Sequence, residues 1–287
     1  GLIGTALSRS LRGDGYQVTT LVRDPATRPD EVQWQPGSAE LDPTVLTGAD
    51  AVVCLSGANV GAKRWTDAYK QTLRTSRIDT VATIARALAA VGDGGPRTFV
   101  AASAVGYYGD AGEREIDESA GPGAGFLAQM CVEWEAATQP AEDADVRVTR
   151  LRTGIVLDRD ADLIRRLRPV FLMGAGGRLG NGRQYLSWIS LTDEVRAIRF
   201  LLDHDVPGSV NVTAPTPVRN AQFTAAFGAV LHRPAVLRVP GVALRIVLGE
   251  LAQDALTGQR AIPAKLQAAG FEFRHPDVES ALRAALR

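Results

Sequence analysis

The order of apolar and polar residues predicts a chain of alternating helices and strands. Leu2, Ile3, Leu7 and Leu11 recur at the spacing of one helix face, and a run of β-forming residues follows a glycine-rich stop at 13–15. A short apolar run such as 49–55 is typical of a parallel strand that is buried on both faces. The expected elements, in chain order, are a helix over 2–11, a strand over 16–23, a strand over 49–55, a helix from about 66 to 91, a strand over 98–103, a helix over 126–138 and a strand over 146–151.

Strands separated by helices of this length indicate βαβ units with right-handed crossovers. The sequence therefore predicts an α/β fold, a Rossmann-type doubly wound parallel sheet, over residues 1–158. The pattern changes after about residue 158, because glycines crowd a loop at 174–182 and the rest carries short helices and one extended segment, 208–213. We expect residues 159–287 to form a small C-terminal α+β substrate lobe.

Composition narrows the class of protein. The chain has 287 residues, of which 45% are hydrophobic and 22% charged, which is typical of a globular protein and excludes wholesale disorder. The 32 basic and 32 acidic residues cancel, so the sequence lacks the basic excess of a protein that binds nucleic acid by bulk electrostatics. We also expect no membrane partner, because no apolar run approaches the length of a membrane helix.

The two cysteines, Cys54 and Cys131, lie far apart in the sequence. They offer no second pair for a metal site, so no metal is expected, and a reducing cytoplasm is the simplest location.

The first residues suit a dinucleotide-binding turn. Gly1-Leu2-Ile3-Gly4 would supply the last two glycines of a G-x-x-G-x-x-G turn, although two glycines also fit an ordinary strand-to-helix turn. Because these residues already read as the entry to a helix, we expect an N-terminal piece to precede residue 1 in the full protein. Arg23-Asp24 lies about twenty residues on, where a ribose-recognising residue belongs. Asp24 would accept a hydrogen bond from a 2′-hydroxyl, whereas Arg23 would pair with a 2′-phosphate.

Many short blocks in one order resemble a known superfamily. The chain looks like an extended short-chain dehydrogenase/reductase, and more narrowly like the atypical epimerase family proteins that carry a C-terminal domain of unknown function of the DUF1731 type, here at about 238–287. The resemblance covers almost the whole chain. It implies that the piece before residue 1 holds the first strand and the first glycine of the dinucleotide turn. Its blocks are Gly1 to Gly4, Ser56 to Asn59, Lys63 to Trp65, Ser76 to Ile78, Ser103 to Asp110, Trp134-Glu135, Arg152 to Leu157, Gly176 to Gln184, Ser187 to Ile189 with Asp193, Asn211 with Ala214-Pro215, Arg233-Pro234, Leu248 to Glu250, Pro263 to Leu266 and Gly270-Phe271.

The resemblance implies an NAD(P) cofactor and the residues that contact it. Arg23 favours NADP(H) over NAD(H), because its positive charge would pair with the 2′-phosphate that only NADP(H) carries. The other implied cofactor-binding positions are Gly1, Leu2, Ile3, Gly4, Ser56, Gly57, Ala58, Arg77, Thr153 and Gly154.

The chain departs from the superfamily at the residues that move protons. The usual pair is a Tyr with a Lys four residues later, in which the Lys lowers the pKa of the Tyr. Here the possible registers pair Phe126 with Met130, or Leu127 with Cys131. The position of the assisting Ser or Thr holds Ala104, and Ser190 stands where the family usually shows a His after Trp-Ile.

Other side chains remain as candidates for the chemistry. Ser103 and Tyr108 are the predicted catalytic residues, because both follow a buried strand at its carboxyl end. The alternative is that one of the two neighbouring tyrosines packs in the core and the other only makes a hydrogen bond. Glu133 and Glu135 are most simply read as a charged helix face. The predicted substrate-contacting residues are Tyr107, Arg183, Gln184 and Trp188, and Arg183 also fits a plain surface position.

Two functions from different classes follow. The first is an NADP(H)-dependent oxidoreductase or epimerase acting on a small molecule such as a nucleotide sugar or a carbonyl compound. The second is a catalytically silent NADP(H)-binding sensor or regulatory protein, which the missing Tyr and Lys favour.

Overall fold

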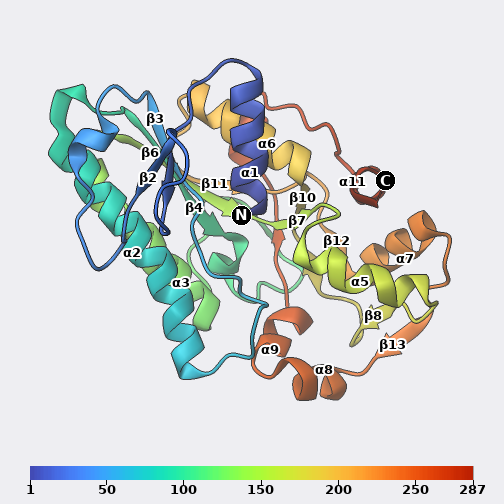
Figure 1. Ribbon diagram of the computed structural model, residues 1–287. Coiled ribbons are helices and arrows are strands. Elements are labelled where there is room, and N and C mark those ends of the chain that lie inside the picture. Colours follow the sequence, from blue (N-terminus) through green and yellow to red (C-terminus); the bar gives the residue numbers. More distant parts are fainter. Residues whose placement is uncertain (287) are drawn as a thin grey trace.

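The computed structural model describes residues 1–286 and shows a parallel sheet with helices on both faces (Figure 1). The strands are β1 (Thr20–Val22), β2 (Glu31–Gln33), β3 (Ala51–Cys54), β4 (Thr98–Ala104), β5 (Glu115–Ile116), β6 (Arg147–Thr153), β7 (Ile155–Leu157), β8 (Gly177–Leu179), β9 (Tyr185–Leu186), β10 (Trp188–Ser190), β11 (Gly208–Val212), β12 (Val218–Arg219), β13 (Leu237–Val239) and β14 (Arg260–Ala261). The helices are α1 (Leu2–Gly13), α2 (Asp67–Val91), α3 (Phe126–Ala136), α4 (Gln139–Glu142), α5 (Asp162–Leu172), α6 (Leu191–Asp203), α7 (Asn220–Leu231), α8 (Gly241–Leu248), α9 (Leu251–Leu256), α10 (Ala264–Ala268) and α11 (Val278–Leu286), with 3₁₀ turns at Pro43–Leu46, Gly92–Gly94 and Val105–Tyr108.

The main sheet has four parallel strands in the order β11-β6-β4-β3. Each crossover between neighbouring strands carries a helix, as parallel pairing requires. The predicted Rossmann-type doubly wound α/β fold is therefore confirmed.

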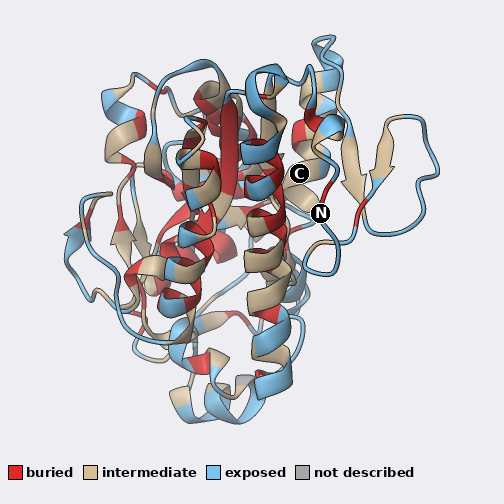
Figure 2. Cartoon of the chain, turned by 90° about the vertical axis from the view of Figure 1, so that its left-hand side faces the viewer, coloured by how far each residue is buried: buried red, intermediate tan, exposed pale blue. Residues whose placement is uncertain are grey.

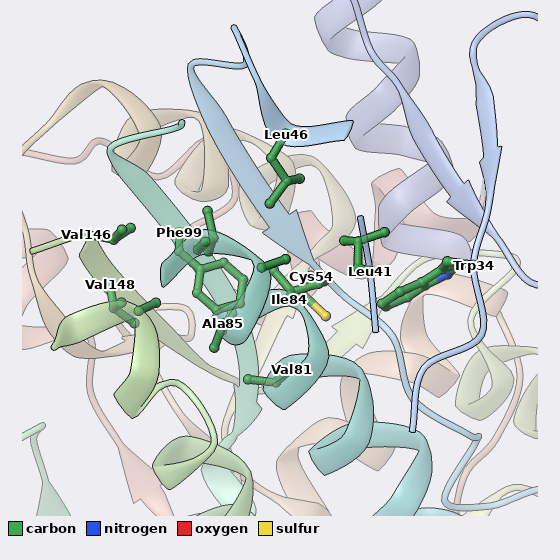
Figure 3. Packing of buried hydrophobic residues seen from close by; sticks show 14 of the residues in the cluster. Trp34, Leu41, Leu46, Cys54, Val81, Ile84, Ala85, Phe99, Val146 and Val148 are labelled. Carbon is green, nitrogen blue, oxygen red and sulfur yellow. The ribbon is translucent and has the colours of Figure 1, made fainter. Parts of the chain in front are cut away.

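Alternate residues of β4 pack into two different cores. Phe99 and Ala101 face α2 and α3, in a cluster that also holds Val148, whereas Val100 faces α1 and α6. Figure 3 shows Phe99 against Val148 in the first cluster, and Figure 2 shows buried residues concentrated on the sheet and on the inner sides of the helices. The same alternation decides which polar side chains near the strand ends share a face.

Strands β1 and β2 form a separate two-stranded parallel sheet. Within residues 1–286, β1 pairs only with β2 and β3 pairs only with β4. The strand that the sequence leads us to expect before residue 1 stays a prediction.

The boundary expected at residue 158 does not divide the fold cleanly. The sequence places the extended segment 208–213 in the substrate lobe, but β11 pairs with β6 as the edge strand of the main sheet. Helix α6 also packs against the sheet, beside α1 (Figure 1). The change in sequence pattern near residue 158 therefore marks the start of an insertion. The chain leaves the main sheet after β6 and returns to it with β11.

The smaller lobe has its own core between α5, α7 and α11. Trp188, Phe171 and Phe227 are fully or almost fully buried in this cluster. The glycine-rich stretch expected as a loop includes strand β8, which pairs with β13. Gly177 is required there, because a Cβ atom would lie 2.5 Å from the carbonyl oxygen of Leu237.

None of the helices among residues 1–286 is both long enough and apolar enough to cross a membrane.

Candidate dinucleotide site and the polar network beside it

The start of α1 offers free backbone donors and open space. Gly1 is the N-cap residue and no side chain caps the helix, so the N–H groups of Leu2, Ile3 and Gly4 have no partner within it. A Cβ atom at Gly1 or at Gly4 would meet nothing within 4 Å among residues 1–286. Free N–H groups at a helix N-terminus fit the negative charge of a pyrophosphate.

Arg23 and Asp24 follow the carboxyl end of β1, as the sequence predicts. Both are exposed, and neither side chain makes an ion pair or a hydrogen bond within the described residues 1–286. The carbonyl oxygen of Arg23 accepts a hydrogen bond from the Gln33 side chain at 3.3 Å. The guanidinium of Arg23 is thus available to a negatively charged ligand group.

The loop after β3 is held in place by α2. Ser76 accepts a hydrogen bond from the N–H of Ala58 at 2.9 Å, and Arg77 donates to the carbonyl oxygen of Ala58 at 2.9 Å. A Cβ atom at Gly57 would lie 3.1 Å from Cζ of Arg77. Arg77 is buried beneath this loop, and burial lowers the pKa of its guanidinium. Arg77 therefore positions the loop of Ser56, Gly57 and Ala58, and a direct contact of Arg77 with the cofactor stays a prediction.

Thr153 is the last residue of β6 and Gly154 follows it, next to α6. The hydroxyl of Thr153 donates to Oε1 of Glu194 at 3.0 Å, while Oε2 of Glu194 is buried and has no partner within residues 1–286. Glu194 is fully buried, and this burial raises its pKa to about 8. Gly154 is required by packing, because a Cβ atom would lie 2.7 Å from the carbonyl oxygen of Ser187.

Three neighbouring strands present polar side chains in one row on the α3 side of the sheet. Ser103, Arg152 and Asn211 are in register across β4, β6 and β11. Glu135 of α3 accepts two hydrogen bonds of 2.8 Å from Arg152, one from Ser103 at 2.7 Å and one from Ser209 at 3.0 Å. Burial alone would raise the pKa of Glu135, but the contacts with Arg152 outweigh it and the pKa lies below its ordinary value. The buried ion pair is therefore charged and fully partnered.

The same network includes Tyr108. Its hydroxyl donates to Oδ1 of Asn211 at 2.7 Å and accepts from Arg152 at 3.0 Å. Tyr108 is only 4% exposed, and burial raises the pKa of its phenol. Tyr107 is half-buried, its ring lies 3.5 Å from Cζ of Arg152, and its hydroxyl makes no hydrogen bond among residues 1–286.

These positions change the roles expected for Ser103 and Tyr108. Both side chains are buried, and both hydroxyl groups are hydrogen-bonded to other residues, so neither is accessible to a substrate. A catalytic role for either residue stays a prediction. Glu135 is buried in an ion pair, so it is not the solvated charged face that the sequence suggested. The sequence signal that was available is Arg152, a charge that directly follows the predicted strand 146–151.

The position of the usual Tyr-Lys pair is apolar. Phe126 packs edge-on against Trp65, with ring centroids 5.2 Å apart, and Met130 is 2% exposed in the same cluster. In the other register, Cys131 is buried, and this burial raises the pKa of its thiol to about 12.

The predicted substrate residues are spread over different environments. Trp188 is fully buried in the lobe core and donates to the carbonyl oxygen of Thr216 at 3.1 Å, so its predicted substrate contact is not supported by its position. The amide group of Gln184 donates to the carbonyl oxygen of Ala255 at 3.1 Å and to that of Leu179 at 3.3 Å, so its hydrogen bonds join parts of the smaller lobe. Arg183 is exposed and pairs with Glu113 at 2.9 Å.

Comparison with known proteins identifies the family. A model of the NAD dependent epimerase/dehydratase family matches residues 1–213, and a model of the domain of unknown function DUF1731 matches residues 239–285. An epimerase family protein of Mycobacterium tuberculosis is 49% identical over 284 residues, which cover 98% of this chain and 93% of the relative. The mouse epimerase family protein SDR39U1 is 34% identical over 289 residues, with 99% and 96% covered.

Solved structures agree with this assignment. The crystal structure of human epimerase family protein SDR39U1 with NADPH superposes with a TM-score of 0.89 at 29% identity, over 99% of this chain and 96% of that one. A nucleoside-diphosphate sugar epimerase from Corynebacterium glutamicum has a TM-score of 0.80 at 32% identity, over 100% of this chain and 56% of that one. Fold, sequence blocks and the DUF1731 segment therefore agree, and the chain belongs to the NAD-dependent epimerase/dehydratase family.

Proposed function

We propose that this protein binds NADP(H) in preference to NAD(H) and acts on a small molecule as an oxidoreductase or epimerase. The observation that carries the cofactor preference is the exposed guanidinium of Arg23 after β1, which pairs with no group among residues 1–286. A guanidinium pairs with a 2′-phosphate through charge-assisted hydrogen bonds, which NAD(H) lacks. The NADPH in the structure of human SDR39U1 supports the same preference.

The residues around the strand ends fit a dinucleotide. The free N–H groups at the start of α1 would hold the pyrophosphate, and the loop fixed by Arg77 would line the site after β3. When bound, the nicotinamide supplies hydride transfer. The protein has to orient the ring and deliver or accept a proton.

The proton route in this chain differs from the usual pair. Tyr108 and Ser103 were the predicted donors, and both hydroxyls are engaged inside the network of Glu135 and Arg152. Tyr107 is the neighbouring phenol whose hydroxyl has no partner within residues 1–286. Its ring rests on the Arg152 guanidinium, and the cation–π attraction holds the side chain in place. Tyr107 is therefore the first residue to vary once a substrate is known.

A second function has an observation of its own. The apolar packing of Phe126, Met130 and Trp65 removes the usual acid and base from α3. A protein of this kind would bind NADP(H) and respond to it without turning it over. Purified protein assayed with NADPH on panels of carbonyl compounds and nucleotide sugars separates the two functions.

The cofactor preference is tested by titrating NADPH and NADH into the unchanged protein and into Arg23→Ala. We expect NADPH to bind more tightly by about 1 to 3 kcal/mol, and Arg23→Ala to remove most of this difference while leaving NADH affinity nearly unchanged. The matched control is Arg97→Ala, since Arg97 lies before β4 at the opposite edge of the sheet. Equal or tighter binding of NADH by the unchanged protein would make Asp24 the selector and refute the proposal.

A further inference from the structure

The outward side of α8 is apolar. Val242, Ile246 and Val247 are 64%, 69% and 68% exposed, and the helical spacing places them on the side away from Leu244. The other side packs inward, since Leu244 is half-buried and a Cβ atom at Gly241 would lie 3.3 Å from the Leu256 side chain. A surface helix usually turns its apolar side to the core, so the apolar side chains that α8 presents to solvent call for a partner.

The apolar surface continues onto the segments next to α8. Val236 and Leu237, at the start of β13, are exposed, and so is Met173 at the end of α5. These segments are adjacent, because the N–H of Leu237 donates to the carbonyl oxygen of Gly176 at 3.3 Å. Figure 1 shows α5, β13 and α8 together at the lower right of the molecule. We call this surface the α8 face, and its apolar residues are Met173, Val236, Leu237, Val242, Ile246 and Val247.

The charges that accompany the α8 face are all positive. Residues 220–249 contain Arg233, Arg238 and Arg245 but no Asp or Glu, and residues 163–192, which include α5, contain five arginines and no acidic residue. The three arginines of the first segment are exposed and form no ion pair among residues 1–286. Since the whole chain has 32 basic and 32 acidic residues, this positive charge is balanced elsewhere in the chain. The complementary partner is therefore both apolar and negatively charged.

Charge and shape together select the occupant of the α8 face. A second copy of this chain, packed on the same face about a two-fold axis, would bring arginines against arginines. The apolar side chains of α8 are largely exposed and project from the surface, so they do not form a groove for an inserted peptide. An anionic membrane surface satisfies both conditions, because lipid phosphates pair with guanidinium groups while apolar side chains enter the boundary between headgroups and acyl chains.

We propose that the α8 face docks on an anionic membrane surface, with the exposed side chains of α8 among the lipid headgroups and the three arginines in contact with lipid phosphates. The expectation of no membrane partner came from the lack of a segment long enough to span a bilayer. A helix that lies on the membrane surface needs no such length, and none of the helices among residues 1–286 has to cross the bilayer. The inference goes beyond the proposed function and does not depend on it.

The experiment is co-sedimentation of the protein with vesicles of phosphatidylcholine alone and with vesicles that also contain the anionic lipid phosphatidylglycerol. We expect binding to the anionic vesicles only, and weaker binding as the salt concentration rises. Ile246→Ser should weaken binding about tenfold or more, because one aliphatic side chain no longer leaves water. Arg245→Gln should weaken it about fivefold, because one basic charge near the membrane is lost. The matched controls are Val132→Ser on α3 and Arg97→Gln before β4, both at exposed positions, and neither should change binding.

The other outcomes overturn the proposal. Equal sedimentation with neutral and anionic vesicles would remove the role of charge, and binding that ignores both Ile246→Ser and Arg245→Gln would lie elsewhere on the molecule. A dimer of the unchanged protein that Ile246→Ser dissociates, measured by light scattering, would make the occupant a second copy. A monomer that binds neither kind of vesicle would leave an acidic protein as the occupant. NADPH affinity should be the same in the unchanged protein and in every variant, so a loss of vesicle binding is told apart from a loss of folding or of cofactor binding.

Discussion

Replacing Glu194 should stabilise the protein at neutral pH and remove a pH dependence of its stability. This carboxyl is fully buried on α6, with one hydrogen bond from Thr153 and an unpartnered Oε2 within the described residues 1–286. No basic side chain contributes to its pKa, which burial raises from 4.5 to about 8. Glu194→Gln keeps the size of the side chain and an oxygen for Thr153, but it cannot ionise.

The magnitude follows from linkage. Between pH 4.5 and about 8 the folded protein holds a proton on Glu194 that the unfolded chain has lost. The favourable contribution is therefore complete below pH 4.5 and falls as the pH rises, by about 1.4 kcal/mol per pH unit, until it levels off above about pH 8. At pH 7 the loss relative to pH 4.5 amounts to about 3 kcal/mol, which is a large share of the stability of an ordinary domain.

The assay is urea unfolding of the unchanged protein and of Glu194→Gln at pH 5, 6, 7 and 8. The difference in the free energy of unfolding cancels the titration of all other groups and should grow in favour of the variant as the pH rises. Glu40→Gln is the matched control, because Glu40 is exposed and makes no ion pair within residues 1–286. Parallel stability curves for Glu194→Gln and the unchanged protein would refute the reasoning, since they would mean that Glu194 is ionised in the fold.

Three further substitutions test the packing around the site. Tyr108→Phe should cost about 1 to 3 kcal/mol of stability, because it leaves buried polar partners unsatisfied, and should leave NADPH affinity unchanged; a loss of turnover with no loss of stability would restore its catalytic role. Glu135→Gln should destabilise the fold by about 3 to 5 kcal/mol in urea unfolding, because the buried charge of Arg152 loses its partner, and an effect below about 1 kcal/mol would contradict the buried ion pair. Gly154→Ala should lower stability by about 1 to 3 kcal/mol through overpacking, whereas Gly13→Ala, with open space around it, should not; equal melting temperatures would contradict the close contact.

Much of the fold could be predicted from periodicity alone. The apolar runs that become β3 and β4 are continuous because both faces of these strands are covered by helices. The helix from 67 to 91 ends where the glycines after Val91 begin, as expected from helix stop signals. The start of α1 and the place of Arg23 after β1 also followed from the spacing of the dinucleotide turn.

The polar network could not be read from the sequence in the same way. Glu135 lies on a helix and Arg152 on a strand, and only their approach in the fold turns two ordinary charges into a buried pair. The burial of Glu194 could not be predicted either. It follows Thr192 and Asp193 in the first turn of α6, where acidic and polar side chains usually cap a helix in solvent. Strand β11 was misplaced because an insertion separates it from β6 along the chain, while in space the two are neighbours.

The replacement of the usual catalytic pair has a consequence for how α3 contributes to the site. In this chain α3 is joined to the sheet by Glu135, which binds Arg152 and Ser103 through short hydrogen bonds, and by the apolar packing of Phe126 at its start. Both attachments are structural, so α3 fixes the geometry of the strand ends without offering a reactive atom. The tyrosines of the turn after β4, Tyr107 and Tyr108, are then the nearest side chains that the sequence offers for moving a proton, and of the two only Tyr107 has a hydroxyl without a partner among residues 1–286.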